Sequence, residues 1–483
     1  MNRHKPKHGT RPFIIFTILA TLLPYSAMAQ QDFGIDACIS YALDHNKDVQ
    51  NAVFDQYIAK AQVKEFAATG FPQVSLGADL QYFVELPTQI LPGFFAPEQD
   101  IVIIDGKPYP LTRLDPETFQ PIPGQAINAQ FGFPWQSTVG ANLNWTAIDG
   151  AYFYGVKAAK EYAELTQRQA NRTREEVVLA VSKAYIQAFI TREQANLLLV
   201  NISRIEKLLT ETKALNTEGF VEAIDVDRLQ INFNNLQLEK AKIERYVLLA
   251  DALLKFQMGM PLEDSLSLLA PESSPQSSPA LPDNISQQYN PEQDLDLAIL
   301  RKTEDLQKLD LKRTQMGYLP KISLFGSYQV NAQRDAFNFL DSDQQWFPIS
   351  VVGLQMNWNV FDSFMKVRKI EQQRIGLDKL QNQQEQLIQA STLEYEQAKM
   401  ELLNAYSTLE STRANVELAN RIFNVATIKY REGVGSSLEL NDANTGLREA
   451  ENANLKAFYD YLQAELSFEK AMGSFSQYHS FRN

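Results

Sequence analysis

Two short stretches decide the fold: "FPQVSLGADLQY" at residues 71–82 and "LPKISLFGSYQV" at residues 319–330. Each follows a helix-like run, begins with Xaa-Pro, and then alternates apolar and polar residues, as an amphipathic strand does. The second stretch begins 248 positions after the first. A chain that carries the same isolated strand twice is expected to be built from a repeated unit.

Two further pairs of motifs support this repeat. "GANLNWTAIDG" (140–150) aligns with "GLQMNWNVFDS" (353–363) at an offset of 213, and "NTEGFVEAIDVDRL" (216–229) aligns with "YREGVGSSLELNDA" (430–443) at an offset of 214. The order in each half is helix, strand, loop, strand, long helix, glycine turn and helix. The first offset is larger because the first strand–strand loop, roughly 85–136, carries 35 more residues. This loop holds nine prolines, so we expect neither regular helix nor central strand there.

The repeat sets the domain boundaries. Residues 1–29 carry a basic segment, an apolar run and a small-residue cleavage site, which predicts a secretory signal peptide. The first repeat then covers 30–258, a Pro/Ser-rich linker covers 259–291, the second repeat covers 292–473, and a C-terminal tail covers 474–483. Without the signal peptide, 41 basic and 58 acidic residues remain, a formal charge of −17, and such a surface repels nucleic acid.

Cys38 is the only cysteine, so an exported chain could form no intrachain disulfide. It could anchor a lipid, but it lies nine residues past the predicted cleavage point, inside a helical run. We therefore interpret it as a buried small hydrophobic residue.

Four strands of about ten residues share one binary pattern, with an apolar face opposite a face of amides and hydroxyls. This pattern suits a tilted membrane strand beside a wet lumen, and it also suits a half-buried sheet of a soluble protein. The apolar positions are Val74, Leu76, Ala78, Leu80, Tyr82 and Val84; Val139, Ala141, Leu143, Trp145 and Ala147; Ile322, Leu324, Tyr328 and Val330; and Val352, Leu354, Met356, Trp358 and Val360.

The helices favour the membrane interpretation. Residues 151–215 and 364–431 contain no proline, and each run would form a helix of roughly 100 Å with one coiled-coil-like apolar stripe. The second long helix is expected to pair with residues 438–472. Four strands leave two open edges, which lipid does not tolerate, and eight would close around an interior filled by side chains. We therefore expect several chains to share one barrel. Asp149 and Asp362 follow the second strand of each repeat and precede a long helix, so we expect them to cap the N-termini of these helices.

In these motifs, and in the opening "ACISYALDHNKDVQNA" (37–52), the chain resembles the TolC-like outer-membrane efflux proteins. The proline-rich loop that begins "ELPTQILPGFF" (85–95) is similar to that of Bacteroidota-type members. The resemblance implies a homotrimer with a shared twelve-stranded transmembrane β-barrel in the outer membrane, in contact with its lipid, and a long α-helical coiled-coil tunnel through the periplasm. It also implies two partners, a periplasmic adaptor (membrane fusion protein) and an inner-membrane transporter.

The resemblance places a gate at the periplasmic end of the tunnel. The stretch "REGVGSSLELNDANT" (431–445) is similar to the family's gate motif, with Glu439 and Asp442 at its two acidic positions. Their spacing puts both carboxylates on one helix face, and threefold symmetry would make them rings that attract cations. The glutamate departs from the family pattern and has a longer reach. Without the family, both residues would be interpreted as a solvated helix face near a helix N-terminus.

The other candidate residues surround the two glycine turns. The repeat pairs Asp225 with Glu439, whereas Arg228 stands where the second repeat has Asp442. Arg228 or Arg431 could lock a closed state by salt bridges. The turns themselves are candidate positions for adaptor docking: Gly219 and Phe220 in the first repeat, and Gly433, Val434 and Gly435 in the second. With or without an adaptor, they are tight turns between helices.

An enzyme is disfavoured, and we expect no cofactor and no metal. Only His45 and His479 remain after the signal peptide, and no Ser/His/Asp set, phosphate loop or zinc-binding cluster is present in the sequence. The sequence predicts the exit duct of a tripartite efflux or type I secretion system. The alternative is a soluble periplasmic coiled-coil adaptor or scaffold.

Overall fold

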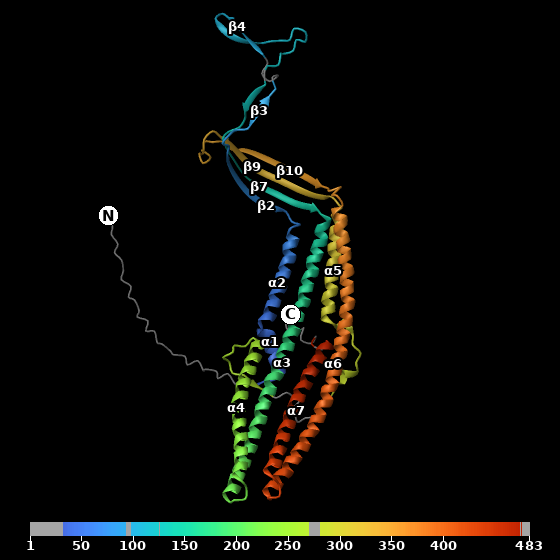
Figure 1. The fold of residues 1–483 in the computed structure, drawn as a ribbon. Helices are drawn as coiled ribbons and strands as arrows, with labels where there is room; N and C mark the ends of the chain where they lie inside the picture. Colours follow the sequence, from blue (N-terminus) through green and yellow to red (C-terminus); the bar gives the residue numbers. More distant parts are fainter. Residues whose placement is uncertain (1–31, 93–97, 125, 270–280, 474, 476–483) are drawn as a thin grey trace, which may run out of the picture. The chain divides into compact units, whose positions relative to one another are not determined.

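The computed structural model describes residues 32–92, 98–124, 126–269, 281–473 and 475 (Figure 1). The chain divides into two compact units. The helical unit consists of Met1–Lys47, Glu176–Ser286 and Lys399–Phe468, and the sheet unit of Asp48–Glu175, Gln287–Ala398 and Glu469–Asn483. Each unit takes segments from both predicted repeats. The predicted signal peptide and nearly all of the predicted C-terminal tail lie outside the described residues.

The structure contains both helices and strands, as predicted. The α-helices are α1 (Ile35–His45), α2 (Lys47–Ala68), α3 (Gly150–Thr217), α4 (Ala223–Met258), α5 (Leu295–Met316), α6 (Met365–Arg431) and α7 (Ser437–Ala471). The strands are β1 (Asp32–Phe33), β2 (Gln73–Tyr82), β3 (Thr88–Leu91), β4 (Gln99–Ile104), β5 (Lys107–Thr112), β6 (Ile127–Gln130), β7 (Trp135–Ile148), β8 (Ser267–Leu268), β9 (Lys321–Arg334) and β10 (Phe347–Asn357). Two short 3₁₀ helices, η2 (Asp283–Ser286) and η3 (Pro291–Gln293), precede α5.

The sheet unit is organised around one antiparallel sheet with the strand order β10-β9-β7-β2. Its register brings the predicted apolar faces of the strands to one side of the sheet. Val74 pairs with Leu143, Leu143 with Gly326, and Gly326 with Val352. The opposite side is polar, and there the Gln329 amide donates to Asn142 Oδ1 at 3.4 Å. The outer edges of β2 and β10 have no partner strand within the described part of the chain.

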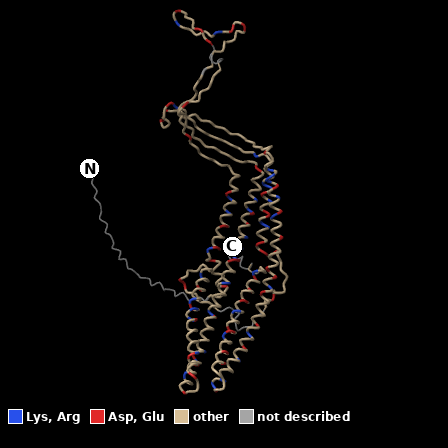
Figure 2. The backbone as a smooth tube through the Cα atoms, in the orientation of Figure 1, with Lys and Arg blue, Asp and Glu red and all other residues tan. Residues whose placement is uncertain are grey.

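The apolar face of this sheet is uncovered. Leu76 on β2 is 85% exposed, and Val352 and Leu354 on β10 are also largely exposed. Only three charged residues lie in the four strands, of which Lys321 and Arg334 are the two ends of β9. Figure 2 shows the contrast with the helices, along which acidic and basic residues alternate. A soluble sheet would normally bury such a face, so this one is suited to contact with another apolar phase.

The end of the fourth strand differs from the sequence prediction, and the proline-rich loop holds strands that were not predicted. The fourth strand was expected to extend to Val360 but ends at Asn357. Beyond it, the Trp358 indole donates to the Tyr318 carbonyl at 3.0 Å, and Ser363 and Phe364 take left-handed backbone conformations that turn the chain into α6. The proline-rich loop also contains the two-stranded ribbons β3–β6 and β4–β5. Two-stranded ribbons tolerate proline because every strand in them is an edge strand.

The two turns from sheet to helix are built alike. At the start of α3, Asp149 Oδ1 accepts a hydrogen bond from the Ala151 N–H at 2.8 Å. At the start of α6, Asp362 Oδ2 accepts from the Lys366 N–H at 3.3 Å. Each carboxylate thus satisfies a free N–H of the first helical turn. The Trp145 indole donates to the Gly70 carbonyl at 2.9 Å, as Trp358 does to Tyr318 at the aligned position.

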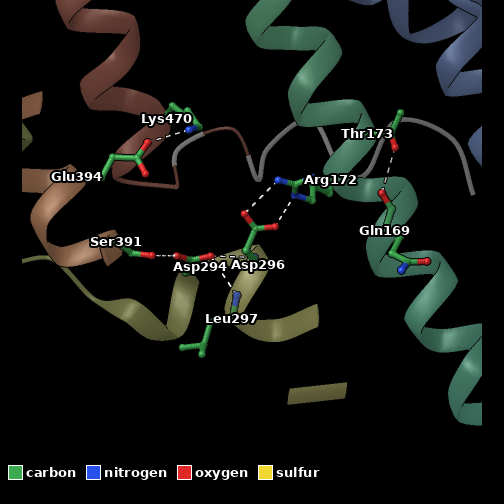
Figure 3. Close-up of polar contacts among 9 residues, drawn as sticks. All are labelled: Gln169, Arg172, Thr173, Asp294, Asp296, Leu297, Ser391, Glu394 and Lys470. Atoms are coloured by element: carbon green, nitrogen blue, oxygen red, sulfur yellow. Dashed lines mark hydrogen bonds and ion pairs between the residues drawn. The ribbon is translucent and has the colours of Figure 1, made fainter. Parts of the chain in front are cut away.

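The N-terminus of α5 is fastened to α3 and α6 within the sheet unit (Figure 3). Asp294 caps the helix by accepting from the N–H groups of Asp296 and Leu297 at 2.8 and 3.2 Å. Its other carboxylate oxygen accepts from the Ser391 hydroxyl of α6, and Asp296 pairs with Arg172 of α3. This site joins three helices through one short segment.

The helical unit has a coiled-coil core. The buried residues of α4 recur every seven positions, as do those of α6 and α7, which is the spacing of packed coiled-coil seams. The residues of this core are Leu198, Ile202, Ile205, Leu208, Leu209, Leu229, Leu236, Ile243, Phe423, Ala426, Tyr430, Leu440 and Leu447. The stripe predicted from the sequence of α3 therefore faces three partner helices of the same unit.

Cys38 lies inside the helical unit, with none of its surface exposed. Burial raises the pKa of its thiol to about 12, so the reactive thiolate is scarce at neutral pH. The structure confirms the interpretation of Cys38 as a buried small residue. None of the described helices is both long and apolar enough to cross a membrane.

Candidate functional site

The candidate site comprises the two glycine turns of the helical unit and the first turns of α4 and α7. Gly219 and Gly433 have φ values of 79° and 73°, a conformation that only glycine adopts without strain. The Phe220 N–H donates to the Leu215 carbonyl at 2.8 Å, and the Val434 N–H donates to the Lys429 carbonyl at 3.0 Å. These bonds are those of a Schellman turn, which ends one helix and frees the chain to start the next.

Each turn displays one apolar side chain. Phe220 is 77% exposed and Val434 78% exposed. Gly435 is close-packed, because a Cβ at this position would lie 3.0 Å from Lys429 Cβ. The turns therefore combine a fixed backbone with a single exposed apolar group, which suits contact with another protein.

Glu439 and Asp442 line one groove between α6 and α7 with a volume of about 920 Å³. Leu418 and Val425 of α6 and Leu438 of α7 supply exposed apolar parts of its wall. Glu439 Oε1 lies 2.9 Å from Lys429 Nζ, so its charge is partly neutralised inside the chain. The structure brings the two predicted gate carboxylates into the same groove.

The third predicted gate residue is held differently. Asp225 is mostly buried, accepts a hydrogen bond from the Ser437 hydroxyl, and pairs with Arg228 at 3.4 Å. Asp225 and Ser437 lie in the first turns of α4 and α7, so this contact joins the N-terminal ends of the two helices. Asp225 therefore tethers one hairpin to the other and does not line the groove of Glu439.

The two candidate lock residues have partners that the sequence did not indicate. Arg228 pairs with Asp225 of its own helix. Arg431 makes two hydrogen bonds to the Glu211 carboxylate on α3, at 2.8 and 3.0 Å. A bidentate arginine–carboxylate contact has a fixed geometry, so it links the end of α6 to α3 more firmly than a single contact would.

A second link between the repeats lies deeper in the helical unit. Arg204 of α3 pairs with Glu451 of α7 at 2.8 Å, and the two side chains are only 18% and 13% exposed. The Tyr430 hydroxyl lies 3.3 Å from Thr212 Oγ1, and the Asn232 amide donates to Asn441 Oδ1 at 2.6 Å. In the sequence, the residues of these three contacts stand out only as polar side chains next to an otherwise apolar heptad stripe.

Within the described ranges, no three His, Cys, Asp or Glu side chains gather as metal ligands would.

Residues 291–474 match the model of the family "outer membrane efflux protein". No curated protein sequence matches the chain. Among solved structures, the outer-membrane channel OprN is 17% identical, with 91% of this chain and 89% of that chain covered and a TM-score of 0.66. The channel CusC is 14% identical, with 92% and 95% covered and a TM-score of 0.68. The MtrE outer membrane channel of Neisseria gonorrhoeae, solved in an open state, is 13% identical, with 91% and 88% covered and a TM-score of 0.66.

These matches confirm the resemblance noted from the strand and turn motifs, and the matched family carries the predicted localisation, the outer membrane, in its name. Residues 291–474 thus match the outer membrane efflux protein family, and about nine-tenths of the chain shares the fold of the outer-membrane channels OprN and CusC.

Proposed function

We propose that three copies of this chain form the exit duct of a tripartite efflux or type I secretion system. The observation that carries the proposal is the four-stranded sheet, which has an uncovered apolar face, a polar opposite face and two unpaired edges. In lipid, such edges must be paired, so β2 of one copy would join β10 of the next. Two copies would give eight strands and a filled interior, whereas three give twelve and room for water.

The polar face of the sheet would line the lumen and the apolar face would contact lipid. The long helices would continue the duct into the periplasm. Conduction through the duct itself would be passive, and an inner-membrane transporter would supply the energy. The fold of OprN, CusC and MtrE supports this architecture, because each is described as a channel or as forming one. The soluble scaffold is disfavoured because it would have to bury the apolar face of the sheet.

The glycine turns would form the periplasmic end, with Glu439 and Asp442 as carboxylate rings that narrow the pore. Arg431–Glu211 and Asp225–Ser437 would hold the α3–α4 and α6–α7 helical hairpins of one subunit together in the closed state. Opening would then require these contacts to break. Phe220 and Val434, exposed at the turns, would meet the periplasmic adaptor.

Conduction by the purified chain tests this proposal. In planar bilayers, detergent-purified mature protein is expected to give discrete, cation-preferring current steps. If the protein inserts into bilayers yet carries no current, even after R431A/S437A removes both the Arg431–Glu211 and the Asp225–Ser437 contacts, the duct proposal fails. The R431A/S437A variant serves as the control for a channel that is simply closed.

A further inference from the structure

A cavity of about 560 Å³ lies where the four-stranded sheet runs into its helices. Its apolar wall includes Phe66, Tyr152 and Met365. Thr146 and Lys321 also line it, and both lie on the polar face of the sheet, since Thr146 pairs with Ser323, two residues from Lys321. The cavity therefore opens on the polar side. Its volume falls in the range of about 300–1,000 Å³ that is usual for small-molecule sites.

The lining of this cavity carries more positive than negative charge. Four cations face two carboxylates: Arg313, Lys321, Lys366 and Lys369, against Asp149 and Asp362. Figure 2 shows basic residues gathered where α5 and α6 meet the sheet.

The cations of the lining are unequally neutralised. Arg313 pairs with Asp310 at 2.5 Å, and Lys366 lies 3.3 Å from the Asp362 carboxylate. Lys321 is 3.8 Å from its nearest carboxylate oxygen, on Asp149, which already caps α3. Among the described residues, Lys369 has no ion pair. Lys321 and Lys369 are thus the cations available to a ligand.

The fold itself does not require these cations. The capping aspartates and the tryptophan contacts occur in both repeats, as expected of structural features. The four cations occur only in the second repeat. At the aligned positions the first repeat has Glu65, Gln73, Phe153 and Val156. A cluster present in one repeat alone points to a role other than helix capping or turn formation.

We propose that this cavity binds organic anions that carry an aromatic or alkyl body. The anionic group would lie between Lys321 and Lys369, and the body against Phe66 and Tyr152. This inference rests on the proposed function, because the polar face borders the lumen only in the assembled barrel. Three copies would then place three such sites at one level of the duct, where an anionic cargo would pause. The same chemistry occurs in the headgroup region of anionic lipids.

Fluorescence anisotropy of 5-carboxyfluorescein tests the proposal on full-length mature protein in a non-ionic detergent. We expect saturable binding that weakens with salt, and a dissociation constant about tenfold higher in the double variant K321Q/K369Q, because two exposed charge contacts are lost. The matched control is K240Q/K456Q, which removes two exposed cations of the helical unit and changes the net charge equally. Unchanged binding in K321Q/K369Q, or an equal loss in the control, would overturn the proposal.

Three further measurements complete the test. Bilayer conductance of K321Q/K369Q shows whether the duct still forms, so a failed anion site is distinguished from a failed duct. Competition by dihexanoyl phosphatidylglycerol identifies the source of the ligand. Displacement of the dye at micromolar lipid supports a lipid headgroup as the natural ligand, and its absence supports an exported anion. A zwitterionic rhodamine of similar size should bind the wild type and K321Q/K369Q equally, and preferential binding to the wild type would contradict the anion requirement.

Discussion

Replacing both Glu439 and Asp442 with alanine is expected to raise single-channel conductance about twofold or more and to lower the preference for cations. In the proposed trimer the double variant removes six carboxylates from the narrowest part of the pore. Charges within about a Debye length of a permeating ion, about 10 Å at 0.1 M salt, act on it directly. The shorter side chains also widen the pore. Planar-bilayer recordings with a salt gradient measure both conductance and selectivity.

The loss of both carboxylates should do more than weaken the preference for cations. Lys429 lies 2.9 Å from Glu439, and it keeps its positive charge when that partner is removed. A cation-preferring entrance would therefore become close to neutral or anion-preferring. The control is the double variant E244A/D460A, which removes two exposed carboxylates elsewhere on the helical unit. Conductance and selectivity that match the wild type would remove Glu439 and Asp442 from the gate.

Replacing Glu451 with alanine is expected to destabilise the helical unit strongly. It leaves Arg204 mostly buried and without its carboxylate, and breaking a well-buried ion pair from one side typically costs about 3–5 kcal/mol. Because both side chains keep some exposure, we expect about 2 kcal/mol here. Hydrogen exchange measures this directly, and amides of α3 and α7 near the pair should exchange roughly thirtyfold faster.

Two variants separate the ion pair from simple loss of packing. R204M/E451M removes both charges and keeps much of the volume, so it should recover most of the lost protection. D460A breaks a well-exposed pair with Lys456 on the same helix and should change exchange by less than about fivefold. If E451A exchanged no faster than D460A, the Arg204–Glu451 pair would not hold the hairpins together.

The long helices were the most predictable part of the fold. A run without proline and an apolar stripe at three/four spacing depend only on local sequence, and α6 begins one residue after its predicted start at 364 and ends at Arg431 as predicted. The strands were recognised from their alternation, but not their ends. β10 ends directly before the residue that makes the Trp358–Tyr318 contact, and this contact is not visible in the alternation pattern.

The candidate site was predictable only in part. The glycine turns follow from local chemistry, and the family resemblance indicated Glu439 and Asp442. The ion-pair partners of the candidate lock residues could not be predicted from the sequence. Glu211 and Arg431, for example, are 220 positions apart and meet only because their helices pack together. For the same reason, the pairing of Asp225 with Ser437 could not be anticipated, and the repeat alignment suggested instead that Asp225 would act as Glu439 does.

Native mass spectrometry of the detergent-solubilised mature protein tests most directly whether separate chains combine their β-hairpins into one barrel. A shared barrel predicts a single species with the mass of three chains, unchanged across a tenfold dilution. A monodisperse monomer that needs no detergent to stay in solution would contradict it, because such a chain would have to cover both edges and the apolar face of its sheet by itself.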